Sequence, residues 1–387
     1  MNYKSFVGIG AVSLFPLLAL GQPSEGFSLG ENTRLFVLQS AEVRYDDNVS
    51  FAGSNGQDDL VYLFTPGVEL NYDAGISKGL LIVSGNLVRY DDHPAYNEDL
   101  LSIVGDYSYQ GAAHRLQALA AYREMSQAMA TIRNREQAIR QNSTTASLED
   151  LWAYSAKTKL GVGVTYDATG YPSSVYADRE SFGVPVDVYF AASPKLDLSV
   201  GYRYRNTQVD ELPGATRSWD SEDHFINVGA KGDFTPKLSG QVRVGYGIRD
   251  LDVASSTSQL GLMGSLTYVY SPKTSFDFTA SNDFSNSELG TSQEALSMRA
   301  GGRFEFNPQW SARAGLSWQS TKYALVPTPG LTGSRKDDFF VGDVGVVYAL
   351  SEVISFQAAY IYRENSSNRA GLDFNNNILS VGASLRF

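Results

Sequence analysis

The sequence predicts an all-β protein, namely a transmembrane antiparallel up-and-down β-barrel of about 18 strands, within a range of roughly 16 to 20. Two observations predict this fold class. Apolar and polar residues alternate over segments of about ten residues, and the connections between these segments are alternately short and long. A third observation, an N-terminal segment with the features of a secretory signal peptide, places the protein outside the cytoplasm.

The composition supports strands and excludes several classes of function. Of 387 residues, 12% are aromatic and 36 are glycine, which favours pleated strands and tight turns. The chain has a net charge of −11 and lacks the basic residues that a nucleic-acid-binding surface requires, so no nucleic-acid partner is expected. The chain has no cysteine, which excludes disulfides, thiol nucleophiles, cysteine-ligated metals and a lipidated N-terminal cysteine.

Residues 1–21 have the pattern of a cleaved signal peptide. Lys4 supplies a positive charge, Phe6–Leu20 is largely apolar, and Ala19-Leu20-Gly21 is a small-residue cleavage site. We therefore expect residues 22–34 to form a short periplasmic segment and residues 35–387 to form the outer-membrane barrel. A retained N-terminal anchor is the alternative. No other apolar run approaches the roughly 20 residues of a membrane helix.

Short turns, most of them with the pattern Ser/Thr-Pro-Lys, recur along the second half of the chain. They read SPK at 193–195, TPK at 235–237, SPK at 271–273 and NPQ at 307–309, about forty residues apart. Each turn is flanked by two alternating segments. Before the second turn, Ile226 and Val228 share one face, whereas Asn227 and Lys231 share the other. The repeated unit is therefore a two-stranded hairpin.

The same alternation locates the strands in order along the chain. They lie near 35–45, 59–73, 79–90, 99–109, 114–123, 143–154, 158–166, 179–190, 195–205, 223–233, 238–249, 259–270, 274–284, 294–306, 310–320, 338–348, 353–363 and 376–387. The segment 79–90 is apolar on both faces, so its orientation stays open. Short connections indicate a periplasmic rim and long ones an extracellular rim, and an even strand number places both termini in the periplasm. A soluble β-sandwich or β-helix is the alternative.

Aromatic residues gather toward strand ends on the apolar faces. Examples are Tyr202, Tyr246, Phe304, Trp310 and Tyr360. Aromatic rings collect at the two interfaces of a membrane, so we expect these residues to form girdles around the barrel. Plain β-propensity is the alternative explanation.

Arginines and carboxylates share the polar strand faces, which should line the lumen. The candidate binding residues are Arg203, Arg205, Arg243, Arg249, Arg299, Arg303, Arg313 and Arg363. The accompanying charged residues are Lys231, Asp187, Asp197, Asp233, Asp277, Asp283, Glu305 and Asp343. One interpretation is a polar channel whose guanidinium groups pair with an anionic solute, such as an acidic sugar polymer. The other is an internal ion-pair network that braces the wall and narrows the pore.

The segment 125–142 is one of the longest connections and carries Arg133, Arg135 and Arg140. Its apolar residues have rough helical spacing, so a loop or helix here would fold into the lumen and form a constriction. The alternative is that the flanking strands extend outside the membrane as a hairpin.

The sequence indicates no enzyme, no cofactor and no metal site. Asp223-His224 joins a carboxylate to an imidazole that it could orient as a base, but nothing places a reacting group beside it. Acidic pairs such as Asp46-Asp47 and Asp91-Asp92 are expected on a solvated rim. There they could hold divalent cations that bridge to lipopolysaccharide, although no EF-hand spacing is present.

Four segments resemble a known family. These are VRYDDNV, TPGVELNYD, the turn YSPKTSFDF and the final hairpin YIYRENSSNRAGLDFNNNILSVGASLRF. They are similar to the family of outer-membrane proteins named Putative beta-barrel porin 2. The resemblance implies an outer-membrane barrel and a conduit linked to exopolysaccharide export, with no catalytic motif to carry over. A general or selective solute porin and a non-conducting structural or adhesive barrel are the alternatives.

The chain ends in an alternating strand with Leu385 and Phe387 on its apolar face. Such a strand must close the barrel against the first strand, because an open edge cannot lie in the membrane. Its terminal aromatic residue also resembles the signal read by the barrel-assembly machinery. The expected partners are that machinery, outer-membrane lipid and lipopolysaccharide, and polysaccharide export components, while the oligomeric state stays open.

Overall fold

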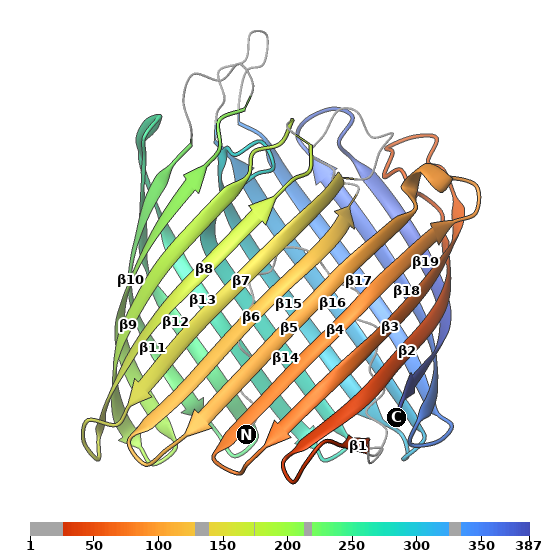
Figure 1. Ribbon diagram of the computed structural model, residues 1–387. Helices are drawn as coiled ribbons and strands as arrows, with labels where there is room; N and C mark the ends of the chain where they lie inside the picture. Colours follow the sequence, from red (N-terminus) through yellow and green to blue (C-terminus); the bar gives the residue numbers. More distant parts are fainter. Residues whose placement is uncertain (1–25, 128–138, 174, 213–218, 325–333) are drawn as a thin grey trace.

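The computed structural model describes residues 26–127, 139–173, 175–212, 219–324 and 334–387, which form one closed antiparallel β-barrel (Figure 1). Consecutive strands are neighbours around the wall, and β19 pairs with β2 to close a ring of 18 strands. The strands are β2 (Thr33–Asp46), β3 (Asp59–Asp73), β4 (Ser77–Tyr90), β5 (Glu98–Gln110), β6 (His114–Gln127), β7 (Ile139–Trp152), β8 (Thr158–Gly170), β9 (Arg179–Ser193), β10 (Leu196–Val209), β11 (Ser221–Asp233), β12 (Leu238–Leu251), β13 (Ala254–Ser271), β14 (Thr274–Asn286), β15 (Ser292–Glu305), β16 (Trp310–Tyr323), β17 (Lys336–Ala349), β18 (Ile354–Ser367) and β19 (Phe374–Arg386).

The fold class and the eighteen predicted strands are confirmed. Most observed strands are longer than predicted by a few residues, mainly at the ends that meet the long connections. There the alternation fades into polar residues, but the hydrogen-bonded ladder continues. We call the rim with the long connections the upper rim and the rim with the short turns the lower rim, as drawn in Figure 1.

The pairing register assigns each residue to the inner or the outer face. In β4, the strand whose orientation the sequence left open, Leu80 and Ile82 face the lumen, whereas Leu81 and Leu87 face outward. The strands β3, β5 and β6 also turn several aliphatic side chains inward. The lumen therefore has an apolar sector along β3 to β6.

The seam between β19 and β2 is fully paired. The register runs from Ile378↔Asp46 to Arg386↔Leu38, and beyond it the Val37 amide donates to the Phe387 carbonyl oxygen at 2.7 Å. A two-residue strand, β1 (Phe27–Ser28), pairs with β2 beside the seam, and the rings of Phe27 and Phe387 lie 6.1 Å apart. The strand β1 and the C-terminus both lie at the lower rim (Figure 1).

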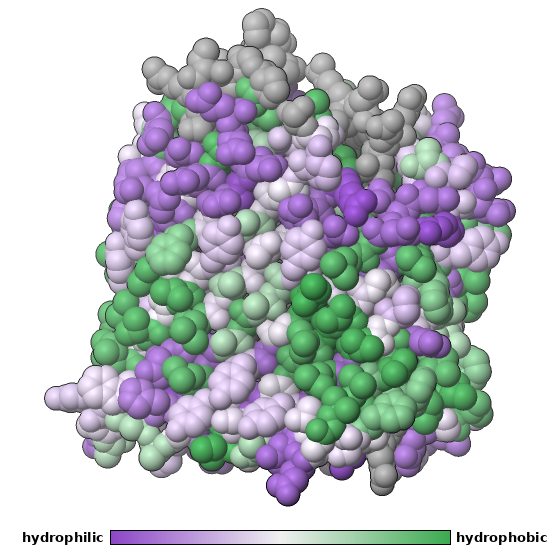
Figure 2. Space-filling model, viewed as in Figure 1, coloured by the Kyte–Doolittle hydropathy of each residue, from purple (hydrophilic) through white to green (hydrophobic). Residues whose placement is uncertain are grey.

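The outer wall carries a hydrophobic belt. Figure 2 shows this belt on the face that it draws, below a broad hydrophilic zone at the upper rim. Large apolar side chains on the outer face are widely exposed; Val228 is 61% exposed and Leu260 is 65% exposed. Burial in lipid explains such a surface, because exposed apolar area of this extent would be unfavourable in water. No helix among the described residues is long and apolar enough to span a membrane.

The lower turns share one device that explains the recurring Ser/Thr-Pro-Lys pattern. In the turn after β11, the Thr235 hydroxyl accepts hydrogen bonds from the amides of Lys237 (3.3 Å) and Leu238 (3.0 Å). Ser351, in the turn after β17, accepts the equivalent pair of bonds without a following proline. A short polar side chain at the first turn position therefore closes the hairpin.

At the upper rim, the connection between β2 and β3 folds inward. The Asn48 side chain donates to the carbonyl oxygens of Ala52 (2.9 Å) and Asn375 (2.8 Å), and the ring of Phe51 contacts that of Phe374. Beneath this contact, Val341, Ile361 and Ile378 form a small buried cluster on the lumen face of β17 to β19. Part of the upper lumen is thus filled by apolar packing.

Candidate functional site: the channel lumen

The structure places the eight candidate arginines on inward-facing register positions. Arg303 and Arg313, for example, are direct cross-strand partners on β15 and β16, and their neighbours Phe304 and Ala312 face outward. The alternation thus places these side chains in the lumen, but their surroundings differ with height in the barrel.

The upper lumen contains a buried network of three arginines and two aspartates. The Asp223 carboxylate of β11 accepts bonds from Arg249 Nε (2.6 Å) and Nη2 (2.8 Å), and from Arg205 Nε (2.7 Å). The Asp283 carboxylate of β14 accepts bonds from Arg203 Nη2 at 2.8 Å and from Arg205 Nη1 at 3.3 Å. Arg249 is 1% exposed, so its charge is fully engaged within the protein.

Asp283 reaches β10 because the top of β14 leaves the wall. Pairing between β13 and β14 ends at Leu262↔Asn282, although both strands continue. Beyond that point, Arg249 donates to the Ser285 carbonyl oxygen at 2.8 Å and the Ala177 amide donates to the Glu288 carbonyl oxygen at 3.0 Å. We call residues 283–291 the inner flap, since they cross the lumen face of β11 to β13.

The inner flap was not anticipated from the sequence, which pointed instead to residues 125–142 as a constriction. Arg133 and Arg135 lie outside the described residues. Arg140 lies in the strand β7, not in a loop, and shares the outward-facing register with Leu148. Its guanidinium contacts Glu124 at 3.0 Å. The expectation that Arg140 lines a constriction is therefore wrong, because Ile139 and Gln141 take the inward positions.

At mid-height, Arg243 of β12 spans the inner wall to β9. Its Nη2 donates to the Asp187 carboxylate at 2.9 Å and to the Tyr189 hydroxyl at 2.6 Å. Gly201 of β10 lies directly opposite Asp187, and any side chain at that position would collide with the carboxylate. This pair crosslinks the wall.

The wall formed by β15 and β16 is different. Arg299 contacts Asp343 at 3.3 Å and Arg303 contacts Glu305 at 2.9 Å, and the two guanidinium-bearing side chains stay 40% and 41% exposed. Arg313 makes no hydrogen bond or ion pair with any described residue, and its Nε is a buried donor without a partner. Because all three point into the lumen, their exposed parts face the channel interior.

The remaining candidate, Arg363, lies on the lumen face of β18 opposite Asn376. Arg44 and Asp46 of β2 are close enough to interact with its charge. Arg44 is itself paired with Glu42 at 2.9 Å. This group forms a second, smaller cluster of charges near the seam.

Asp223 and His224 do not form a catalytic pair. Asp223 faces inward, where two arginines bind it, whereas His224 faces outward and contacts the Tyr202 hydroxyl at 2.8 Å. Consecutive residues of a strand point to opposite faces, so their adjacency in sequence separates them in space. Within the described part of the chain, no group of three or more His, Asp or Glu residues could hold a metal ion.

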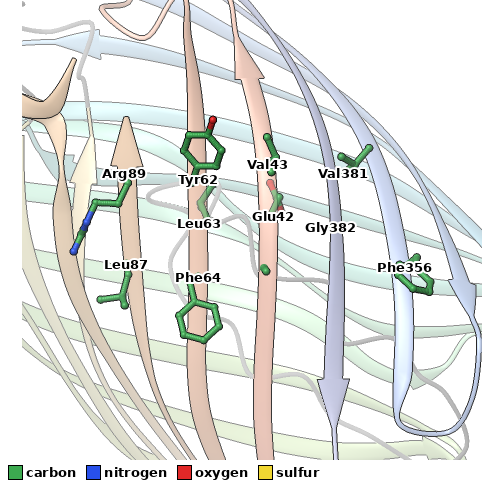
Figure 3. Close-up of a pocket in the computed structure, with 11 residues that line it drawn as sticks. Glu42, Val43, Tyr62, Leu63, Phe64, Leu87, Arg89, Phe356, Val381 and Gly382 are labelled. Carbon is green, nitrogen blue, oxygen red and sulfur yellow. The ribbon is translucent and has the colours of Figure 1, made fainter. Parts of the chain in front are cut away.

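A groove of about 610 Å³ lies on the outer wall and not in the lumen. It crosses the seam, and its lining includes Tyr62, Phe64, Leu87, Phe356 and Val381 (Figure 3). At its margin Arg89 is already bound by Asp99 at 2.6 Å. Since these side chains have outward register positions, the groove belongs to the lipid-facing surface.

Comparison with known proteins identifies the family. The family model described as Putative beta-barrel porin 2 matches residues 37–387, which is nearly the whole barrel. The chain belongs to this family. It is accordingly an outer-membrane β-barrel of the porin or transporter type.

Solved structures with the same kind of fold are outer-membrane barrels of low sequence identity. The ferric citrate transporter FecA has 14% identity and a TM-score of 0.42, with 87% of this chain and 60% of that chain covered. The outer-membrane protein OpdK from Pseudomonas aeruginosa has 12% identity and a TM-score of 0.45, with coverages of 91% and 99%. The siderophore receptor PirA from the same organism has 10% identity and a TM-score of 0.46, with coverages of 95% and 81%. The chain thus spans 60% of the length of FecA. No curated protein matches it.

Two features of the lumen could not be read from residue types. Arg386 of β19 pairs with Glu69 of β3 at 2.7 Å across the seam, although the two residues are far apart in sequence. The inner flap likewise follows from contacts between distant strands. For both features, the sequence offered only the alternation pattern. This pattern predicts which face of the strand a side chain lies on, but not which distant residue it contacts.

Proposed function

We propose that this barrel is a passive channel for anionic solutes that carry carboxylate groups. The observation that carries the proposal is a group of three arginines on the lumen face of β15 and β16. The side chains of Arg299 and Arg303 are 40% and 41% exposed, and Arg313 has no hydrogen-bond or ion-pair partner among the described residues. An exposed guanidinium in a confined lumen attracts carboxylates, because its planar fork donates two parallel hydrogen bonds. In the upper lumen, by contrast, Arg203, Arg205 and Arg249 are bound by Asp223 and Asp283.

Both interpretations of the arginines therefore find support, at different heights. The network around Asp223 braces the upper wall, because its members are buried and bound to one another. The arginines of the lower lumen keep donors free for a solute. The geometry favours a channel whose attraction for anions is concentrated near β15 and β16.

Export of an acidic exopolysaccharide is the second candidate. Arg299 and Arg303 lie four positions apart on one strand, a spacing of about 13 Å. A polymer with repeating carboxylates could contact both side chains at once and move from one to the next. The resemblance to exopolysaccharide-associated barrels supports the same candidate. A non-conducting structural or adhesive barrel is the outcome if no conductance is found.

The orientation and partners are also part of the proposal. We place the lower rim in the periplasm, since short turns at that rim are typical of outer-membrane barrels, so that both termini of the mature chain are periplasmic. The terminal residues Leu385 and Phe387 would then be presented to the barrel-assembly machinery. Lipopolysaccharide would surround the acidic upper rim, with divalent cations between the two.

Conductance of the purified barrel in planar bilayers tests the proposed function. We expect a channel that prefers anions, and we expect the double variant Arg303→Gln/Arg313→Gln to lose that preference, measured as a shift of the reversal potential in a salt gradient. The matched control is Lys322→Gln, a 67% exposed residue on the outward register of β16, which should leave selectivity unchanged.

Oligosaccharides distinguish the two candidates. An acidic oligogalacturonate that blocks the open channel for longer than the monomeric acid supports polymer export, and its block should weaken in the double variant. Equal block by a neutral oligosaccharide would contradict recognition by charge. Loss of surface polysaccharide on deletion, without any change in solute permeability, would favour export over a solute porin.

A further inference from the structure

The inner flap leaves a vacancy in the wall. Strand β13 continues for eight residues above Leu262, from Ala254 to Gly261, yet this stretch pairs only with β12 among the described residues. The Leu260 carbonyl oxygen accepts a bond from the Asn282 side chain at 2.5 Å, in place of a strand partner. An unpaired strand edge is unfavourable, because its amide and carbonyl groups lack the partners that a ladder supplies.

The vacant edge matches the flap in register. Continuing the β13–β14 ladder past Leu262↔Asn282 would pair Gln259 with Ser285 on the lumen face and Leu260 with Phe284 on the outer face. Leu260 is 65% exposed and would gain an aromatic neighbour. The Gln259 amide nitrogen and the Ser285 hydroxyl are both buried without a hydrogen-bond partner in the described structure. The same ladder would bring these two side chains opposite each other.

Inside the lumen, the flap covers a pair of arginines. The Asp283 carboxylate accepts bonds from both Arg203 and Arg205, and the Phe284 ring packs under the Arg249 guanidinium at 5.0 Å. Without the flap, the upper lumen would hold Arg203, Arg205 and Arg249 beside two acids, Asp223 and Asp167. Three cations beside two carboxylates leave a net positive charge that can bind an anion.

We propose that the inner flap is a gate. In the state seen here, Asp283 occupies a carboxylate-binding site formed by Arg203 and Arg205. A carboxylate-bearing solute displaces Asp283, and the flap then docks on the vacant edge of β13, which opens the upper lumen. The flap keeps its ladder with β15 in both states. This inference rests on the proposed function for the nature of the solute, but the movement itself can be measured without conductance.

Each state has its own stabilising contacts, as a two-state element requires. The lumen-docked state has the charge-assisted bonds of Asp283, and the wall-docked state has new backbone hydrogen bonds and the Gln259–Ser285 pair. A solute shifts the balance only because it binds the arginines in the wall-docked state and competes with Asp283 in the other.

Disulfide trapping tests the gate, and the chain has no native cysteine to interfere. The variant Gln259→Cys/Ser285→Cys should form its disulfide in the folded barrel, since the bond requires the wall-docked state. Ser265→Cys/Thr279→Cys, a lumen-face pair within the permanent ladder, is the positive control. Gln259→Cys/Ser281→Cys, which is out of register, is the negative control. Correct folding is verified by the different gel mobility of heated and unheated samples.

The role of the solute is tested by the rate of trapping. Sodium galacturonate should accelerate disulfide formation, whereas galactose with sodium chloride at equal ionic strength should not. The additional change Asp283→Asn should raise the trapping rate without solute by about ten-fold, the factor that one charge-assisted hydrogen bond is worth. Asp277→Asn, a lumen-facing change lower on β14, should have no such effect.

Conductance then links movement to passage. The oxidised Gln259→Cys/Ser285→Cys barrel should conduct more than the same protein after reduction. Absence of the disulfide while the positive control closes fully would overturn the gate, as would equal conductance before and after reduction. Trapping that galacturonate does not accelerate would overturn displacement of Asp283 by the solute. A barrel that conducts without anion preference contradicts the proposed function alone, because the trapping result does not depend on it.

Discussion

At the scale of single residues, Asp223 connects two arginines of the upper lumen. One carboxylate binds the guanidinium groups of Arg205 and Arg249, and its side chain is 3% exposed. Removing one partner from such a group is costly, because it leaves a buried charge without compensation. The same substitution at an exposed ion pair has little effect, since water replaces the lost partner.

We therefore expect Asp223→Asn to lower the free energy of unfolding by about 3 to 5 kcal/mol. The control is Asp73→Asn at the lower rim, where Asp73 and Lys78 are each 60% exposed, and where the change should stay within about 0.5 kcal/mol. Urea unfolding of both variants in detergent micelles provides the comparison. Equal losses in the two variants would show that the Asp223 network does not brace the wall.

Single residues also show what could not be predicted from the sequence. Alternation predicted that Arg249 and Arg299 face the lumen, and the register places both there. It could not predict that Arg249 is 1% exposed while the Arg299 side chain is 40% exposed. The difference arises from partners on other strands and on the inner flap, and residue type carries no information about such long-range contacts.

At the scale of elements, the wall depends on a few glycines that allow a backbone no other residue adopts easily. Gly240 of β12 has φ +148°, and a side chain there would collide with the carbonyl oxygen of Ser265 on β13. Gly85 of β4 has open space around it and no such φ. Substitutions at these two positions therefore distinguish the effect of backbone strain from the effect of replacing a glycine in a strand.

Gly240→Ala should destabilise the barrel by about 2 kcal/mol, because alanine meets both an unfavourable φ and a backbone clash. Gly85→Ala should be neutral or slightly stabilising, since it restricts only the unfolded chain. Thermal unfolding followed by the loss of the compact form on unheated gels measures both. A neutral Gly240→Ala would mean that the β12–β13 ladder tolerates a shift at this point.

The element that the sequence predicted least well is the top of β14. Its residues keep the alternation of a wall strand through Phe284, so alternation indicated a strand that stays beside β13 to its end. The strand was confirmed over its whole predicted length, but its upper end lies inside the barrel. The cause is Asp283, whose two arginine partners are on β10. The local sequence pattern cannot show whether the upper end of β14 stays in the wall or moves into the lumen.

At the scale of the whole molecule, the strand number and the closure of the barrel both follow from the sequence, because each hairpin repeats the same local pattern. Each hairpin has its own alternation and its own turn, so a wrong boundary at one strand does not change the predicted number of strands. Closure adds one requirement, that β19 ends in register with β2. The bonds between Val37 and Phe387, at 2.7 Å and 3.2 Å, meet that requirement through backbone atoms alone.

Because the seam uses the backbone of Phe387, the aromatic ring is free to have another role. It is 38% exposed and touches only Phe27 among the aromatic rings of the described residues. Phe387→Ala should therefore refold in detergent with nearly the yield of the parent, yet its amount in the outer membrane should fall several-fold if the ring is read during assembly. Immunoblots of outer-membrane fractions and refolding yields measure the two effects separately. A parallel loss in both would assign the ring to stability, and unchanged levels in the membrane would contradict its role as an assembly signal.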